Sequence, residues 1–334
     1  MARIRAILTA VATAVRRDLK TVGSFSGNNL FVVSVVLLFL KDPGAFAALN
    51  AFIGVMLFIP LSADPLRVLP RDRLAVWPLR AAERRLLRIL TPWLSPVTWL
   101  VAALAVWRRV TLGVCALAAA LFAIGFLLPA LPAARSGVWR HIPAFPGRLN
   151  HLLRKNLREM LSTLDFWCSA VLSAFCLGFR AAGLLPTEAF LPMTVVVLLA
   201  LSTYAQTLFG LDGDAGMTRY RLLPVPGWQI VAAKDVPFLL LALLVSLPLA
   251  PAAGAGGALA ALAMGHYASV THHGGQVRWR FSSGLSFGSS IVQVVIMAGA
   301  AAAVEAIPLL LAVCAGAYAL STWWFGRVLE EQPV

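Results

Sequence analysis

Long apolar stretches alternate with short polar, basic stretches along nearly the whole chain. A helix needs about 20 mostly apolar residues to cross the roughly 30 Å hydrocarbon core of a bilayer. A window of that length predicts an all-α polytopic membrane protein with about ten transmembrane helices. A count of nine or eleven stays open, because the Pro- and Gly-rich stretch 248–257 also suits a re-entrant or broken helix. The predicted spans are 24–40, 44–62, 89–107, 110–131, 165–184, 188–210, 236–252, 254–271, 286–304 and 306–325.

The composition supports this reading and excludes other classes. Of the 334 residues, 60% are hydrophobic and only 13% are charged, and the mean hydropathy is +0.83. A soluble domain carries about 25% charged residues, so this chain has too little polar surface to cover a globule. We exclude a water-soluble enzyme, a disordered protein and a fibrous protein.

The formal charge of +14 would suggest nucleic acid on a soluble protein. Here the positions of the basic residues give a different explanation. All of the 28 lysines and arginines except Lys41, Arg108, Arg109 and Arg180 fall on one side of the predicted spans. Short loops rich in Lys and Arg stay in the cytoplasm. We therefore expect both termini to be cytoplasmic, in a multi-pass protein of the bacterial cytoplasmic (inner) membrane, and no nucleic-acid partner.

The chain contains signs of an internal duplication. An amphipathic helix is predicted within the first twenty residues and a second one at 148–164, and such helices lie in the headgroup layer. At the same offset of 146 residues, the basic loop 73–88 aligns without gaps on 219–234. Two parallel half-repeats are therefore predicted, residues 1–147 with four spans and residues 148–334 with six. The alternative is a chance likeness of two basic loops between apolar segments.

Each aligned loop contains a proline that opens a stretch suited to a short helix on the membrane surface. Such a helix either anchors the protein on anionic lipid of the bilayer or docks a cytoplasmic partner. The candidate contact residues are Pro78, Arg80, Glu83, Arg84 and Arg85 in the first loop, and Pro224, Trp228 and Gln229 in the second.

A turn motif precedes the second loop, formed by Asp212, Gly213, Asp214 and Gly216. Asp and Gly at this spacing favour tight turns. The spacing is not that of a calcium-binding EF-hand, and no Gly-Lys-Ser/Thr follows as in a phosphate-binding loop. No such phosphate loop occurs anywhere in the chain. We therefore expect that the chain does not bind ATP in the usual way. Since no suitable cluster of acid, base or metal-ligating residues is found either, we expect no catalytic residue, no metal and no cofactor.

Polar residues at membrane depth are costly and indicate function by default. The candidates for a translocation path are Asn50, Gln206, His266 and Gln293. No carboxylate falls near the middle of a predicted span, which argues against a carrier driven by protons or sodium. The four cysteines fall in predicted spans without metal-type spacing and are interpreted as packing residues.

Several stretches resemble the membrane subunits of ATP-binding-cassette (ABC) transporters of the type-2 exporter class. They are Phe209-Gly210-Leu-Asp212-Gly213-Asp-Ala-Gly216, then Leu223-Pro224-Val225 and Lys234, and the opening helix at 155–167. Gly265-His266-x-x-Ser269 resembles a Gly-Asn-x-x-Ser element of that class, with His266 in place of the Asn. The likeness is best over 150–280, and the first half lacks the Asp-Gly element.

This resemblance implies a permease subunit that is not itself an enzyme and is driven by a separate ABC ATPase. It also implies that residues 78–85 and 224–229 are coupling segments that dock on the ATPase. The substrate is unidentified, and a hydrophobic, lipid-like or peptide-like molecule suits the apolar spans. A homodimer or a second permease chain is a further expected partner. The alternatives are an ATPase-independent carrier or channel, an intramembrane enzyme, and an accessory subunit.

Overall fold

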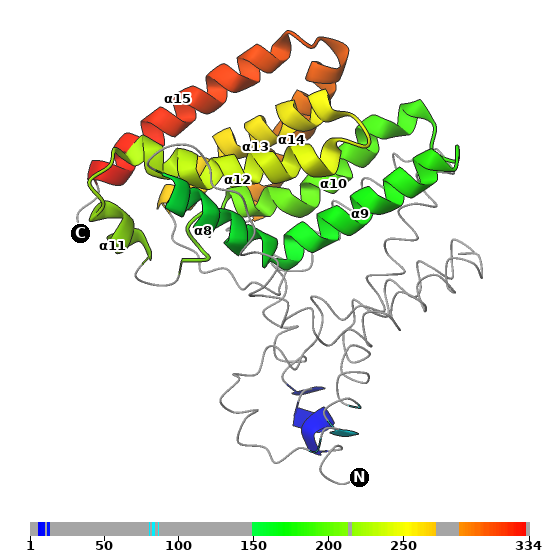
Figure 1. The fold of residues 1–334 in the computed structure, drawn as a ribbon, viewed down its shortest axis with the longest axis horizontal. Helices are drawn as coiled ribbons and strands as arrows, with labels where there is room; N and C mark the ends of the chain where they lie inside the picture. The colour runs from blue at the N-terminus through cyan, green and yellow to red at the C-terminus, as the bar shows by residue number, and fades with distance from the viewer. Residues whose placement is uncertain are drawn as a thin grey trace. The chain divides into compact units, whose positions relative to one another are not determined.

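The computed structural model describes residues 6–10, 12–13, 80, 82–83, 86, 149–212, 216–271 and 287–331. The long described stretches, from 149 to 331, belong to one compact unit of the chain (Figure 1). They are helical and contain no strand. Most of the predicted first half, including Asn50, Pro78, Arg84 and Arg85, lies outside the described residues.

The described elements run in chain order from an amphipathic helix to a long C-terminal helix. Six long helices, α9, α10, α12, α13, α14 and α15, follow the amphipathic α8, and α13 contacts α10, α12, α14 and α15. Figure 1 shows α9, α10, α12, α13 and α15 running alongside one another, with α14 packed behind α13. The bounds are α8 Asn150–Leu161, α9 Leu164–Ala181, η6 Thr187–Ala189, α10 Phe190–Ala205, α11 Gly216–Arg221, α12 Gly227–Ser246, α13 Pro251–Thr271, α14 Phe287–Ala306 and α15 Leu310–Glu331.

Three described helices are long and apolar enough to cross a membrane: Thr187–Ala205, Gly227–Ser246 and Ser289–Ala306. The pair Asn150–Leu161 and Asp165–Ala181, bent by 69°, adds a fourth if it counts as one span. For the described residues, an all-α fold with helices long and apolar enough to span a membrane is therefore confirmed. The count of ten spans and the two half-repeats stay predictions, because too little of the first half is described.

One predicted span is wrong at its start. The window placed it at 236–252, whereas α12 begins at Gly227 and ends at Ser246. Because Lys234 and Asp235 are charged, the hydropathy window left out residues 227–235. Both side chains are nevertheless fully buried in the helix. Their charges face partners within the protein, so hydropathy alone misplaces the boundary.

The alternative of a broken helix at 248–257 is not seen. Leu247–Ala250 forms the turn after α12, and α13 then runs unbroken from Pro251 to Thr271. The glycines of this stretch serve close packing: a Cβ on Gly254 would lie 2.2 Å from Ser246 Oγ, and one on Gly256 would lie 2.6 Å from Val304. Glycine is therefore needed here for helix contact rather than for a break.

Each end of the bundle is tied across helices. At one end, Arg180 of α9 donates to the carbonyl of Pro248 and lies 4.6 Å from the ring centre of Phe190 on α10. At the other end, the Gly227 N–H at the start of α12 donates to the Glu330 carboxylate of α15. A Cβ on Gly326 would lie only 2.4 Å from the Trp228 backbone nitrogen. The start of α12 and the end of α15 therefore pack backbone to backbone.

Candidate functional site

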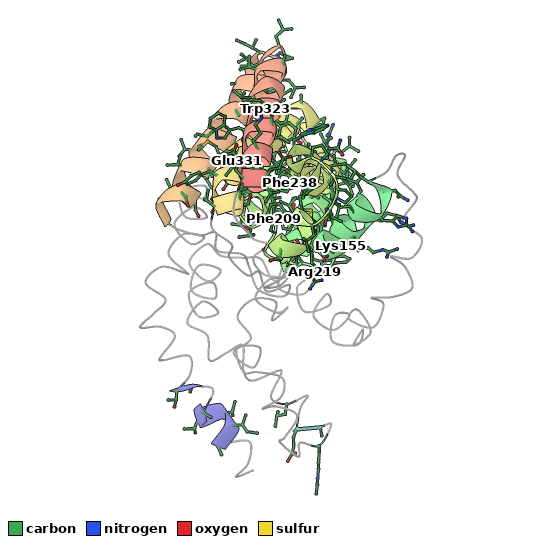
Figure 2. All side chains as sticks on the ribbon, turned by 90° about the vertical axis from the view of Figure 1, so that its left-hand side faces the viewer. Lys155, Phe209, Arg219, Phe238, Trp323 and Glu331 are labelled. Carbon is green, nitrogen blue, oxygen red and sulfur yellow. The ribbon has the colours of Figure 1, made fainter. Side chains whose placement is uncertain are left out.

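A cluster of charges joins α8, the loop after α10, α11 and α12. We call it the Asp212 cluster, and its members are Lys155, Glu159, Asp212, Tyr220 and Lys234. Asp212 accepts hydrogen bonds from Lys155, from Lys234 at 2.5 Å and from the Tyr220 hydroxyl at 2.9 Å. Glu159 adds ion pairs to Lys155 at 3.5 Å and to Lys234 at 3.8 Å. Figure 2 shows Lys155, Phe209 and Arg219 at the same end of the bundle.

The electrostatics of the Asp212 cluster follow from burial and from opposite charges. The side chains of Lys234 and Asp212 are 0% and 2% exposed, whereas that of Lys155 is 47% exposed. Burial by itself raises the pKa of Asp212, but Lys234 and Lys155 outweigh it, so the pKa lies below its ordinary value. Burial and the Asp212 charge together raise the pKa of Tyr220. The cluster therefore holds an ionised Asp212 and a neutral phenol.

A proline in α12 explains why α8 carries a buried asparagine. Pro237 has no N–H, so the carbonyl of Ala233, four residues earlier, lacks its helical donor. The Asn156 side-chain amide of α8 donates to that carbonyl at 2.7 Å, and Asn156 is fully buried. Together with the Asp212 cluster, this contact fixes the amphipathic helix to α12.

A second cluster lies on the next residue of α12 and joins it to α13 and α15. We call it the His266 cluster, and its members are Asp235, His266, Tyr318 and Ser321. His266 Nε2 lies 3.2 and 3.1 Å from the two oxygens of Asp235, and Nδ1 lies 2.9 Å from Ser321 Oγ. The Tyr318 hydroxyl donates to Asp235 at 3.0 Å. Asp235 and His266 are both fully buried.

The connectivity of Ser321, His266 and Asp235 is that of a hydrolase triad, but the surroundings do not suit acyl transfer. The Ser321 hydroxyl already donates to the Ala263 carbonyl at 2.8 Å. Ser321 also lies in the middle of α15, where backbone N–H groups are held by helical bonds and none is available for an oxyanion. The cluster is better suited to holding a proton than to attacking a substrate.

Two of the predicted path residues contact each other. The Gln206 amide donates to Gln293, and Gln293 donates to the Ser202 carbonyl at 2.7 Å, which links α10 with α14. Both side chains are buried at 2% exposure. His266 is also buried, and Asn50 lies outside the described residues. The described path candidates therefore sit between packed helices.

The predicted coupling residues of the second loop are mostly at the surface. Pro224 is exposed, Trp228 is 47% exposed, and Gln229 is half-buried in the first turn of α12. The predicted short surface helix after Pro224 is thus the start of α12 itself, and the separate short helix α11 precedes the proline. Leu222 and Leu223, which precede Pro224 in the chain, are also exposed, at 72% and 42%, and the sequence analysis did not single out Leu222.

The remaining site predictions are only partly covered. Asp212 lies in a turn, where its N–H donates to the Phe209 carbonyl at 3.1 Å, and Gly216 begins α11. Gly213 and Asp214 lie outside the described residues. In the first loop, the Arg80 N–H donates to Glu83 at 2.9 Å, as at the start of a helix.

Asp235 is the functional candidate that the sequence analysis missed, because it had been placed in a loop. Its position directly after Lys234 and directly before the apolar run that begins at Val236 was the available signal. Among the described residues, no group of three or more His, Cys, Asp or Glu side chains could hold a metal ion.

No family model, curated protein or solved structure matches the chain. The resemblance to ABC exporter permeases therefore rests on the motifs alone.

Proposed function

We propose that this chain is the transmembrane permease subunit of an ABC exporter, driven by ATP hydrolysis in a separate ATPase subunit. The observation that carries the proposal is the Asp212 cluster, which joins the loop, the interfacial helix and α12 through buried ion pairs. An ATPase can move a membrane helix only if the helix is firmly connected to the surface that the ATPase binds. This cluster supplies such a connection.

The surface that would bind the ATPase consists of Leu222, Leu223, Pro224, Pro226 and Trp228, all exposed. Trp228 is the second residue of α12, and its backbone packs against Gly326 of α15. A push on this surface is therefore delivered to α12 and α15 together. Exposed Arg219 beside it adds positive charge.

The competing role for this surface is a lipid anchor, which would use the same mixture of apolar and basic residues. The two roles differ in what they require of geometry. An anchor needs only apolar area, so it tolerates replacement of Trp228 by another apolar residue. A protein interface depends on the shape of a large aromatic anchor.

The test is co-purification of the full chain, in detergent, with each ABC ATPase encoded by its source genome. We expect one ATPase to bind, and its hydrolysis rate to change when the permease is present. Trp228→Leu should weaken that binding at least tenfold, whereas Trp324→Leu, an exposed tryptophan of α15, should leave it unchanged. Charge reversal at Arg84 and Arg85 tests the first loop in the same assay. The proposal fails if no ATPase binds, and the loop is a lipid anchor if Trp228→Leu binds like the wild type.

A second candidate function is favoured by one observation. Asp235 lies eight residues inside α12, in a helix apolar enough to span a membrane. The sequence analysis argued against a proton-driven carrier because no carboxylate was expected near the middle of a span. The position of Asp235 inside α12 removes that objection. An ATPase-independent carrier would move protons in vesicles that contain the purified chain alone. An internal pH dye that responds to the chain without any ATPase would favour this candidate.

A further inference from the structure

We propose that Asp235 and His266 form a proton-binding site that holds one shared proton in the packed state and links proton occupancy to the contact between α12, α13 and α15. The inference does not depend on whether an ATPase drives the chain. It rests on the hydrogen bonds that surround the pair.

The hydrogen bonds fix the number of protons. Ser321 has one hydroxyl hydrogen, and it is directed to the Ala263 carbonyl at 2.8 Å. His266 Nδ1, 2.9 Å from the same hydroxyl oxygen, must therefore be the donor of that contact. The remaining ring nitrogen, Nε2, faces both oxygens of Asp235. Only one hydrogen fits in that gap, either on the ring or on the carboxyl group.

Both distributions of this proton leave the pair with no net charge. Removing the proton places a lone pair of His266 against a carboxylate. Adding a second proton places two hydrogens in one gap and a positive charge in a fully buried site. Either change is unfavourable in a medium of low polarity. The packed arrangement of the three helices therefore requires one proton, and loss or gain of a proton favours their separation.

Among the described residues, no other charged side chain contacts Asp235 or His266 and could take over the shared proton. From α15, the pair faces Tyr318 and Ser321, with Phe325 at 6.3 Å from the His266 ring centre. From α12, the neighbouring Lys234 is committed to Asp212. From α10, the fully buried phenol of Tyr204 lies within electrostatic reach of Asp235, Glu159 and Asp212. Tyr204 is thus close enough to interact electrostatically with carboxylates of both clusters.

The first test compares the wild type with the double variant D235N/H266Q, which keeps polar side chains but cannot bind a proton. Chemical unfolding in detergent is measured from pH 3 to pH 9. An unfolded Asp and His together hold two protons below about pH 4, one between about 4 and 6.5, and none above. A folded pair that keeps one proton is therefore most stable, relative to the double variant, between about pH 4 and 6.5. Its relative unfolding constant should rise about tenfold per pH unit on either side of that window.

The single variants predict slopes of opposite sign. H266Q leaves Asp235 buried without its partner, so the neutral acid is favoured and stability rises as the pH falls. D235N leaves a buried imidazole that must stay neutral, so stability rises as the pH increases toward about 6.5. Both singles should unfold at a lower denaturant concentration than the double variant. Parallel pH slopes in the two singles would overturn the shared proton.

A second measurement covers the case in which a variant fails to fold. Nitrogen NMR of the wild-type chain, labelled at histidine, reports which ring nitrogens carry hydrogen. We expect the His266 signals to stay constant from pH 5 to pH 8, with Nδ1 protonated throughout. Exposed His151 is the internal standard for a histidine in contact with solvent. A His266 signal that changes with pH in step with His151 would contradict the proposal.

Discussion

At the residue scale, Lys234 and Asp235 are two opposite charges on successive positions of one helix, and each has its own partner. Lys234 bonds to Asp212 in the loop, and Asp235 bonds to His266 on α13. Successive residues of a helix point about 100° apart, so neither charge neutralises the other directly. Each ion is instead compensated by a different part of the protein, which makes both necessary for the packing of α12.

Asp212→Asn should destabilise the chain by about 3–5 kcal/mol, since it leaves the fully buried Lys234 with only Glu159 at 3.8 Å. The pKa of folded Asp212 is lowered, so its contribution is complete above about pH 4 and is lost as the pH falls through the folded value. The difference between wild type and variant should therefore shrink in acid. Unfolding in detergent at pH 7 and at pH 3 checks this.

The matched control for this prediction is Glu159→Gln. The Glu159 side chain is 12% exposed and its two ion pairs are longer than those of Asp212, so we expect a smaller loss of stability at pH 7. An equal loss in the two variants would show that Asp212 has no special place in the cluster.

At the element scale, α12 and α15 approach each other through glycine. A Cβ on Gly326 would meet the nitrogen and Cα of Trp228 at 2.4 and 2.5 Å, and backbone atoms cannot move aside as a flexible side chain can. Small residues at such crossings allow close contact between helices in a membrane. The Glu330 carboxylate then satisfies the first N–H of α12.

Gly326→Ala should force these two helices apart and lower the free energy of unfolding by about 1–3 kcal/mol. Gly316→Ala is the control on the same helix, because nothing lies within 4 Å of its added Cβ. The control should be neutral or slightly stabilising, by up to about 1 kcal/mol. Thermal unfolding of both variants in one detergent decides the matter, and equal stability of the two would refute the close contact.

At the scale of the whole molecule, the described helices alternate in direction, so their connections fall at two ends. The Asp212 cluster, the start of α12 and the end of α15 share one end. The turns at 182–189 and 247–250 share the other, as the bond from Arg180 to Pro248 indicates. The distribution of basic residues predicts that the first of these ends faces the cytoplasm.

Single cysteines in a cysteine-free background test that orientation. Leu222, 72% exposed, lies in the loop before α12, and Leu309, 83% exposed, lies in the turn between α14 and α15. In intact cells, an impermeant maleimide should label a cysteine at 309 and leave one at 222 unlabelled until the membrane is opened. The reverse pattern would invert the predicted topology.

The sequence allowed the six described long helices to be located, because each is an apolar run bounded by polar residues or by a turn that contains proline or glycine. The predicted start of α12 was wrong, because a hydropathy window penalises a charged residue even when that charge is paired inside the folded protein. Lys234 is compensated by Asp212, 22 residues away, and Asp235 by His266, 31 residues away. Such pairings depend on how helices pack and cannot be read from a local window. For the same reason Asp235 was missed, although His266 was singled out.

The bond between Asn156 and Ala233 also has a consequence for how the protein is made. Donor and acceptor are 77 residues apart, so α8 leaves the ribosome and reaches the membrane surface well before α12 is complete. Without Asn156, α12 would enter the bilayer with an unsatisfied carbonyl near Pro237, at a cost of several kcal/mol. We therefore expect insertion of α12 to be coupled to its docking on α8, which is synthesised first.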